Sequence, residues 1–174
     1  MLTFFMEKNM LKAFYFLVFL LSGMGFFSHA QNVSPLQGSI SVARIVRVKE
    51  QDGKYRFYRY RNIEEAKPGD ILEYDIAYVN VSKHPLSEIQ ILGPIPQNTF
   101  FYTGTLKTKN TTEMLASIDG GKHFSKPPLQ KKVEKEGQIV FIEISEKEWT
   151  HIQCLVPRLM PGEDARVRYW VIVK

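Results

Sequence analysis

The sequence contains only one cysteine, Cys154, in 174 residues. A chain with a single cysteine forms no internal disulfide, so its stability has to come from packing even in an oxidising compartment. Cys154 lies in the apolar stretch 152–156, and free cysteine is among the residue types most often buried. We therefore expect a small buried side chain here rather than a reactive or intermolecular thiol.

The motifs of the common enzyme classes are absent as well. There is no Gly-x-Ser-x-Gly elbow, no Ser-x-x-Lys, no glycine-rich phosphate loop and no dinucleotide fingerprint. The histidines His84, His123 and His151 have no second ligand at zinc spacing. Neither Asp70 nor Asp119 lies in a dense Asp/Asn loop of the kind that binds calcium. We expect a protein that is not an enzyme, with no catalytic residue, no metal and no cofactor.

No large excess of charge of either sign is present. The 23 basic and 18 acidic residues give a net charge of +5, and the charges are scattered along the chain. Such a surface attracts anionic partners weakly and selects none of them. Because 44% of the residues are hydrophobic and 24% are charged, the composition is that of one folded domain rather than a disordered chain.

The first thirty residues have the composition of a signal peptide. Lys8 and Lys12 form a basic start, the stretch 13–27 is apolar, and 28–30 place small residues before a cleavage site. We expect residues 1–30 to be removed, so that the mature chain begins at Gln31. Contact with the membrane would then be limited to the leader before cleavage.

An uncleaved membrane anchor is the alternative for this segment. Its apolar run of about 15 residues is shorter than the ~20 that a spanning helix needs, which favours cleavage. Translation can begin at Met1 or at Met6 with the same mature product. We expect export to the periplasm, the extracellular medium or the cell surface.

The remainder of the chain is dominated by alternation of apolar and polar residues with a period of two. In 72–79 the residues Leu72, Tyr74, Ile76 and Tyr78 alternate with Glu73, Asp75, Ala77 and Val79, which indicates a strand with one buried face. Further candidate strands are separated by turns rich in glycine and proline. They lie at 39–50, 55–60, 87–92, 99–102, 114–119, 138–145, 151–156 and 165–173.

This pattern predicts an all-β fold, an immunoglobulin-like antiparallel β-sandwich of about seven to nine strands. We expect a short linker at 31–38 and the sandwich domain at 39–174. Arg166 and Arg168 fix the orientation of the last strand, because an unpaired buried guanidinium would cost several kcal/mol. The alternation also places Asp75 on the solvent side as a surface residue. The predicted core side chains are Leu72, Tyr74, Ile76, Tyr78, Val167, Tyr169, Val171 and Val173.

Five segments in this order resemble the bacterial envelope family called domain of unknown function 11. They are 66–80, 93–104, 117–128, 149–153 and 159–169. The resemblance implies a single copy of an immunoglobulin-like β-sandwich that is found on secreted and cell-surface proteins. The family has no assigned activity.

One strand combines aromatic and basic residues in a way that could serve a ligand. The candidate ligand-binding residues are Tyr55, Arg56, Tyr58, Arg59 and Tyr60. Aromatic rings beside guanidinium groups stack on sugars and hold anions, although aromatic residues are also ordinary strand formers.

Three functions are compatible with these observations. The first is a noncatalytic structural or interaction module of the cell envelope, whose partner is an envelope protein. The second is a lectin-like module that binds a cell-surface glycan or another anion through the Arg/Tyr strand, and the third is an enzyme with a site built from loops. Nucleic acid is not an expected partner, because an exported chain seldom meets it. The sequence leaves the oligomeric state open.

Overall fold

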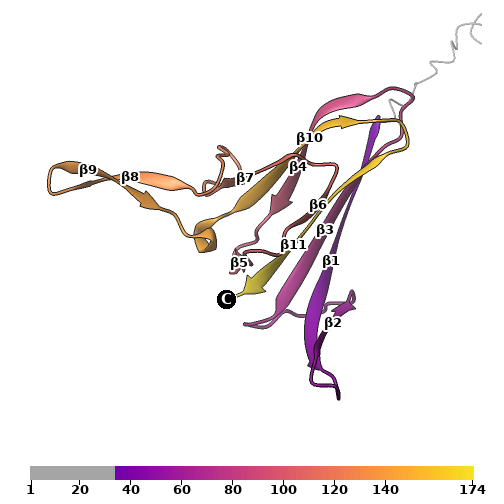
Figure 1. Ribbon diagram of the computed structural model, residues 1–174, viewed down its shortest axis with the longest axis horizontal. Helices are drawn as coiled ribbons and strands as arrows, with labels where there is room; N and C mark the ends of the chain where they lie inside the picture. Colours follow the sequence, from indigo (N-terminus) through magenta and orange to yellow (C-terminus); the bar gives the residue numbers. More distant parts are fainter. Residues whose placement is uncertain (1–33) are drawn as a thin grey trace, which may run out of the picture. The chain divides into compact units, whose positions relative to one another are not determined.

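The computed structural model of the protein describes residues 34–174 (Figure 1). The expected signal peptide, 1–30, lies outside the described residues. The strand β1 (Leu36–Lys49) begins within the segment 31–38, so the end of the expected linker is part of a sheet. Among residues 34–174, no helix is both long enough and apolar enough to cross a membrane.

The described part of the chain is all-β, and every strand pairing is antiparallel. Eleven strands are present where the sequence predicts seven to nine. The one helical turn is the 3-10 helix η1 (Glu146–Glu148), whose first turn is capped by the Ser145 side chain. After β1 the strands are β2 (Tyr55–Tyr60), β3 (Ile71–Asn80), β4 (Leu86–Pro94), β5 (Thr99–Phe101), β6 (Lys107–Lys109), β7 (Glu113–Ser117), β8 (Gln130–Lys135), β9 (Gln138–Glu143), β10 (His151–Leu159) and β11 (Asp164–Val173).

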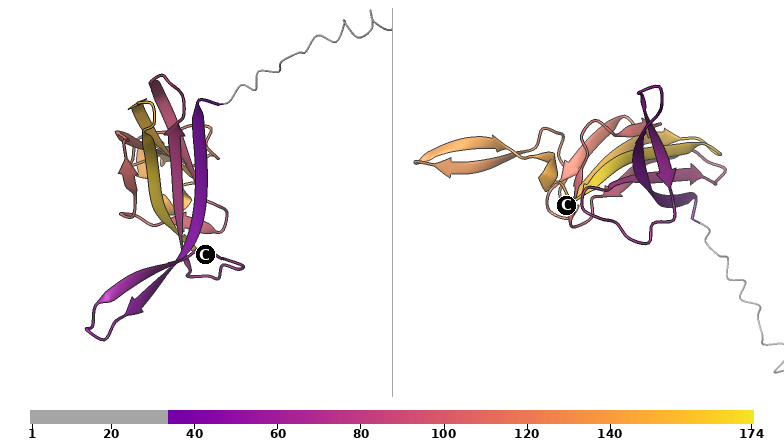
Figure 2. Two further views of the ribbon diagram at one scale, coloured as in Figure 1. Left: turned by 90° about the vertical axis from the view of Figure 1, so that its right-hand side faces the viewer. Right: turned by 90° about the horizontal axis from the view of Figure 1, so that it is seen from below.

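These strands form two sheets with one shared core, and a separate hairpin. The larger sheet has the order β2-β1-β3-β11-β5, with β6 also pairing to β11, and the smaller has the order β4-β10-β7. Figure 2 shows β1, β3 and β11 side by side. The hairpin of β8 and β9 pairs with neither sheet. Buried residues of both sheets belong to one hydrophobic cluster, so the fold is a two-layer β-sandwich.

The predicted core of β3 and β11 is confirmed. Leu72 and Ile76 are buried, Tyr74 and Tyr78 pack against the same cluster, and the inward residues of β11 from Val167 to Val171 are fully buried. Tyr169 stacks on Tyr74 with ring centroids 5.5 Å apart. Its hydroxyl donates a 2.6 Å hydrogen bond to the Pro94 carbonyl, which satisfies the polar end of a buried ring.

In β1 the apolar residues Ile40, Val42, Val46 and Val48 alternate with other residues, but of these four only Val42 packs against the core cluster. Ile40 is 57% exposed and Val48 is 38% exposed, whereas Ala43 and Ile45, on the other side of the strand, are buried. The three-stranded sheet is narrower than the six-stranded one, so the core-facing side of the outer strands is only partly covered. Ala43 and Ile45 are instead covered from the opposite side of the sheet.

Tight turns precede and follow β3. Before β3, the Asp70 backbone N–H donates to the Lys67 carbonyl, and Gly69 takes a φ of 90°, which glycine adopts without strain. After β3, the Asn80 Oδ1 accepts the Ser82 backbone N–H at 3.0 Å. Its amide also donates to the Leu159 carbonyl at 2.9 Å, so the asparagine ends the strand and links it to β10.

Candidate functional site

A cluster of charged side chains covers the side of the six-stranded sheet that is turned away from the core, here called the outer face. Its centre is Glu73 of β3, whose side chain is only 4% exposed. Arg59 of β2 donates to the two Glu73 oxygens at 2.5 and 3.1 Å, and the Trp170 indole N–H donates at 2.8 Å. Each donor comes from a different strand, so the carboxylate joins β2, β3 and β11.

These contacts determine the protonation state of Glu73. Burial opposes ionisation of the carboxyl, but the hydrogen bonds from Arg59 and Trp170 and the nearby charge of Arg168 outweigh it, and the pKa lies below its ordinary value. Glu73 is therefore ionised at neutral pH. A carboxylate in this state cannot donate a proton to a substrate as a general acid.

A second carboxylate, Asp75, lies beside Glu73 on the same face. It forms ion pairs with Arg166 at 3.5 Å and with Arg168 at 3.2 Å, and its side chain is 24% exposed. Asp75 thus lies on the side away from the core, as the alternation predicts, and there it is a connected member of the network. Arg166 and Arg168 point away from the core, which confirms the predicted orientation of β11.

The edge strand β6 adds further positive charge to this face. Lys107 lies opposite Arg168, and Lys109 lies opposite Arg166. Lys109 forms an ion pair with Asp164, and its hydrogen bond lowers the pKa of that carboxyl. These lysines were not among the residues that the sequence singled out.

The outer face is therefore basic overall. Arg61, which follows β2, lines a shallow depression there together with Arg59, Arg166 and Arg168. With the two lysines of β6, six basic side chains share the face with three acidic ones, Glu73, Asp75 and Asp164. Within the described chain, neither Arg61 nor Lys107 forms an ion pair.

A row of aromatic rings borders the charged cluster. Phe57 of β2 lies 5.4 Å from Trp170, and Tyr102 lies 6.2 Å from Trp170 on its other side, as measured between ring centroids. Phe57 is 51% exposed and Tyr102 is 39% exposed. Exposed aromatic faces next to fixed cations can accept the apolar face of a sugar ring and its anionic substituents together.

The structure divides the five candidate residues of the Arg/Tyr strand between the two sides of the sheet. Tyr55 and Arg59 face outward, and the Tyr55 ring carries the Arg47 guanidinium 3.6 Å above its centroid. Arg56, Tyr58 and Tyr60 face the other way, because successive residues of a strand alternate. The five residues therefore lie on two sides of the sheet, and of the five only Arg59 belongs to the charged cluster.

The hydroxyl of Tyr58 is engaged with the neighbouring hairpin turn. It donates to the Glu50 carboxylate at 2.6 Å, and this hydrogen bond raises the pKa of the phenol. Arg56 and Tyr60 are exposed on the same side as Tyr58. This side therefore offers solvated polar groups without a network like that of the outer face.

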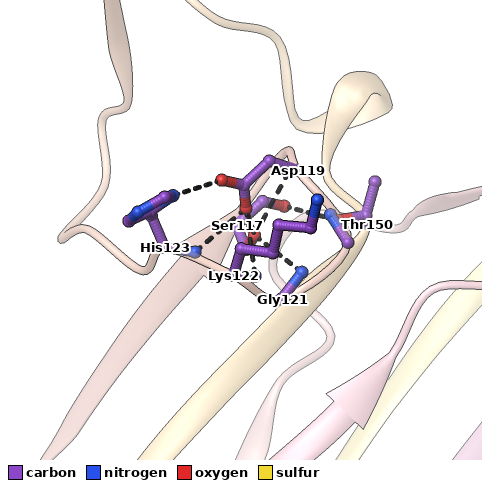
Figure 3. Close-up of polar contacts among 7 residues, drawn as sticks. Ser117, Asp119, Gly121, Lys122, His123 and Thr150 are labelled. Atoms are coloured by element: carbon purple, nitrogen blue, oxygen red, sulfur yellow. Dashed lines mark hydrogen bonds and ion pairs between the residues drawn. The ribbon is translucent and has the colours of Figure 1, made fainter.

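The loop after β7 holds a second polar cluster (Figure 3). Asp119 Oδ1 accepts the Ser117 hydroxyl at 2.7 Å and the His123 backbone N–H at 3.0 Å, while Oδ2 lies 2.6 Å from His123 Nδ1. These hydrogen bonds hold the pKa of the Asp119 carboxyl well below its usual range. The Ser117 hydroxyl is directed at the carboxylate and not at the imidazole, so the cluster orders the turn and does not activate a nucleophile.

Metal ligands and the single thiol are the remaining candidates for chemistry in the part of the chain that the structure describes. Within residues 34–174, no group of three or more histidine, cysteine, aspartate or glutamate side chains is placed to hold a metal ion. Cys154 is fully buried, and burial raises the pKa of its thiol to about 11, which agrees with the expected inert side chain. Comparison with protein-family models, curated proteins and solved structures finds no match. The resemblance to domain of unknown function 11 thus stays a prediction.

Proposed function

We propose that this protein is an exported, noncatalytic binding module of the cell envelope that holds acidic polysaccharide on the outer face of its six-stranded sheet. One observation carries this proposal: six basic side chains and a row of three aromatic rings lie together on one face. The immunoglobulin-like character of the sandwich and the location in the periplasm or at the cell surface are parts of the same proposal.

The chemistry of this face suits a sugar polymer that carries carboxylate or sulfate groups. Guanidinium groups form paired hydrogen bonds with such anions, and exposed aromatic rings stack on the apolar face of a sugar ring. Arg166 and Arg168 are already held by Asp75, so they lose little side-chain freedom when a ligand binds. The depression has a volume of about 170 Å³, below the ~300–1,000 Å³ of sites that enclose a drug-sized molecule, which fits a chain lying across the sheet better than a small molecule in a pocket.

A binding role without catalysis agrees with the state of the two central acids. Hydrolysis of a glycosidic bond requires one carboxyl that is protonated and can donate, beside a second that is free to act on sugar or water. Glu73 is ionised and accepts three hydrogen bonds, and both Asp75 oxygens are directed at arginines. These acids hold the arginines and the indole in place.

A binding assay with matched variants tests the proposal. The probes are polygalacturonate, dextran sulfate and neutral dextran, and binding is measured by titration calorimetry at low and moderate salt. We expect binding of at least one anionic polymer and none of neutral dextran. Replacing Arg61 and Lys107 together by alanine should weaken binding about tenfold or more, since a hydrogen bond to a charged group contributes ~1.5–3 kcal/mol.

The control for this experiment is Arg56→Ala. Arg56 lies on the same strand as Arg59 but faces the other side of the sheet, so its loss lowers the net charge without touching the outer face. If Arg56→Ala weakens binding as much as the single substitution Arg61→Ala, measured in the same assay, the attraction depends on net charge alone and the proposed face is wrong. Equal binding of neutral dextran would equally reject it.

Export is tested separately from binding. The proposal requires that protein purified from the host begins at Gln31, with residues 1–30 removed. Mass analysis of the intact protein measures this directly. A product in the membrane fraction that still begins at Met1 or Met6 would show an uncleaved anchor instead.

A further inference from the structure

The hairpin formed by β8 (Gln130–Lys135) and β9 (Gln138–Glu143) leaves apolar side chains in contact with water. Figures 1 and 2 show it extending away from both sheets. The four consecutive residues 139–142 are Ile, Val, Phe and Ile, with exposures of 58%, 40%, 64% and 42%. Since neighbouring residues of a strand face opposite sides, both faces of β9 are apolar and uncovered.

The hairpin has too few strands to be stable by itself. Its base is fixed, because Leu129 and Ile144 are buried in the core and joined by a backbone hydrogen bond of 2.8 Å. Beyond this base, β8 and β9 pair with no strand except each other, and Lys131 of β8 forms an ion pair with Glu148 at 3.9 Å. A two-stranded hairpin is marginally stable in water, and three or more strands are needed to stabilise it. Pairing with a further strand would stabilise the hairpin.

The two edges of the hairpin differ in charge. β8 carries Lys131, Lys132 and Lys135, and lysine on an edge strand discourages pairing with another chain. β9 has no charge at all between Gln138 and Glu143. The open edge is therefore that of β9, and its sequence has the high β-propensity and low charge of a segment that pairs with another strand.

We propose that the β9 edge pairs in antiparallel orientation with β9 of a second copy of this chain, giving a four-stranded sheet β8-β9-β9-β8. About a two-fold axis centred on Val140 or Phe141, the apolar residues of one copy lie opposite those of the other, and no like charges meet. The equivalent pairing of two β8 edges would bring six lysines and only two glutamates, the two copies of Glu134, into one pair of strands, which is less favourable because like charges that lie opposite each other are destabilising.

Self-pairing also closes the assembly. A two-fold contact uses the same edge on both copies and leaves the two β8 edges outside, where lysines protect them. Pairing of β9 with the exposed edge strand β2 of another copy would use different surfaces on each chain and would continue into a fibre. This inference concerns a different surface from the outer face, so it does not depend on the proposed binding function.

Two valines that lie opposite each other in the hairpin provide a matched test. Val140 on β9 pairs with Val133 on β8 and points to the same face. Sedimentation equilibrium of the exported protein should show a dimer at micromolar concentration. Val140→Lys should weaken the dimer at least tenfold, while Val133→Lys, the same change one strand further from the proposed axis, should alter it less than threefold.

Cross-linking tests the contact without relying on a loss of association. Val140→Cys and Phe141→Cys are oxidised in separate samples, with Val133→Cys as the control. The native Cys154 is fully buried and does not contribute. We expect a covalent dimer from at least one of the two β9 variants and none from Val133→Cys. A wild-type monomer at 100 micromolar, cross-linking of Val133→Cys equal to that of the β9 variants, or equal weakening by the two lysine substitutions would overturn the inference.

Discussion

Replacement of Glu73 tests whether the charged cluster on the outer face stabilises the fold. Glu73 accepts two hydrogen bonds from Arg59 and one from Trp170. Alanine would remove all three and leave the indole N–H without its acceptor. Glutamine retains an acceptor oxygen of similar position but removes the charge, so the two substitutions separate the effect of the charge from that of the contacts.

The size of the effect follows from the exposure of each partner. A hydrogen bond to a charged group contributes ~1.5–3 kcal/mol when it is well buried. The Arg59 side chain is 48% exposed, so water can replace much of the hydrogen bonding that Arg59 loses in the variant. The stabilisation assigned to the Arg59 hydrogen bonds is therefore reduced. We expect Glu73→Ala to lower the free energy of unfolding by about 2–4 kcal/mol and Glu73→Gln by about 1–2 kcal/mol.

The pH dependence provides a second test of the same residue. The pKa of Glu73 in the folded protein lies below its ordinary value of 4.5, so the ionised form is favoured by folding. Its contribution is fully present well above pH 4.5, declines as the pH falls below that value, and is lost below the folded pKa. The stability difference between wild type and Glu73→Gln should therefore shrink on acidification.

Urea denaturation followed by tryptophan fluorescence measures both effects, at pH 7 and at intervals down to pH 3. Glu64→Gln is the control, because Glu64 is exposed and the same change there should alter stability by less than about 0.5 kcal/mol. If Glu73→Gln is as stable as the wild type at pH 7, the carboxylate does not stabilise the fold. A difference that stays constant from pH 7 to pH 3 would show that charge is not its cause.

Three further substitutions or modifications test the core. Ile76→Ala, at 4% exposure, should cost ~2–5 kcal/mol in urea denaturation, whereas Ile40→Ala, at 57% exposure, should cost less than about 1 kcal/mol; equal midpoints would contradict the observed orientation of these strands. Cys154, whose pKa is about 11, should resist iodoacetamide at pH 8 until urea unfolds the protein, and rapid labelling of the native protein, detected by mass, would show that the thiol is accessible. Gly93→Ala places a Cβ 2.8 Å from atoms of Ile152 and Tyr169 and should destabilise by ~1–3 kcal/mol in the same urea assay; an unchanged midpoint would show that the two side chains move aside.

The sequence predicts most of the strands because their residues alternate and their turns contain glycine or proline. The strands at 71–80 and 164–173 are identified with the correct faces, since charged residues on one side of each exclude the opposite choice. β6 and β8 are not predicted, because Lys107–Lys109 and Gln130–Lys135 are dominated by charge and have no apolar face. Their strand conformation comes from pairing with β11 and β9.

The candidate site is only partly predictable, for a physical reason. Alternation tells which residues share the face of one strand, but it does not tell which strands become neighbours. Ala43, Glu73 and Trp170 lie in one row across three strands only because of the observed registers. The Arg/Tyr strand was therefore identified as a whole, although Arg59 alone of its arginines reaches the cluster around Glu73.

The basic residues of the proposed binding face fall into two groups. Arg59, Arg166 and Arg168 are held by Glu73 and Asp75, so they are ordered before a ligand arrives but much of their charge is already compensated. Arg61 and Lys107 have no such partner in the described chain, so they supply most of the attraction that acts at a distance. A face with only unpaired cations would attract any anion through charge alone. Fixed guanidinium groups add a preferred geometry, and holding them in place is the role of the carboxylates in the proposed binding face.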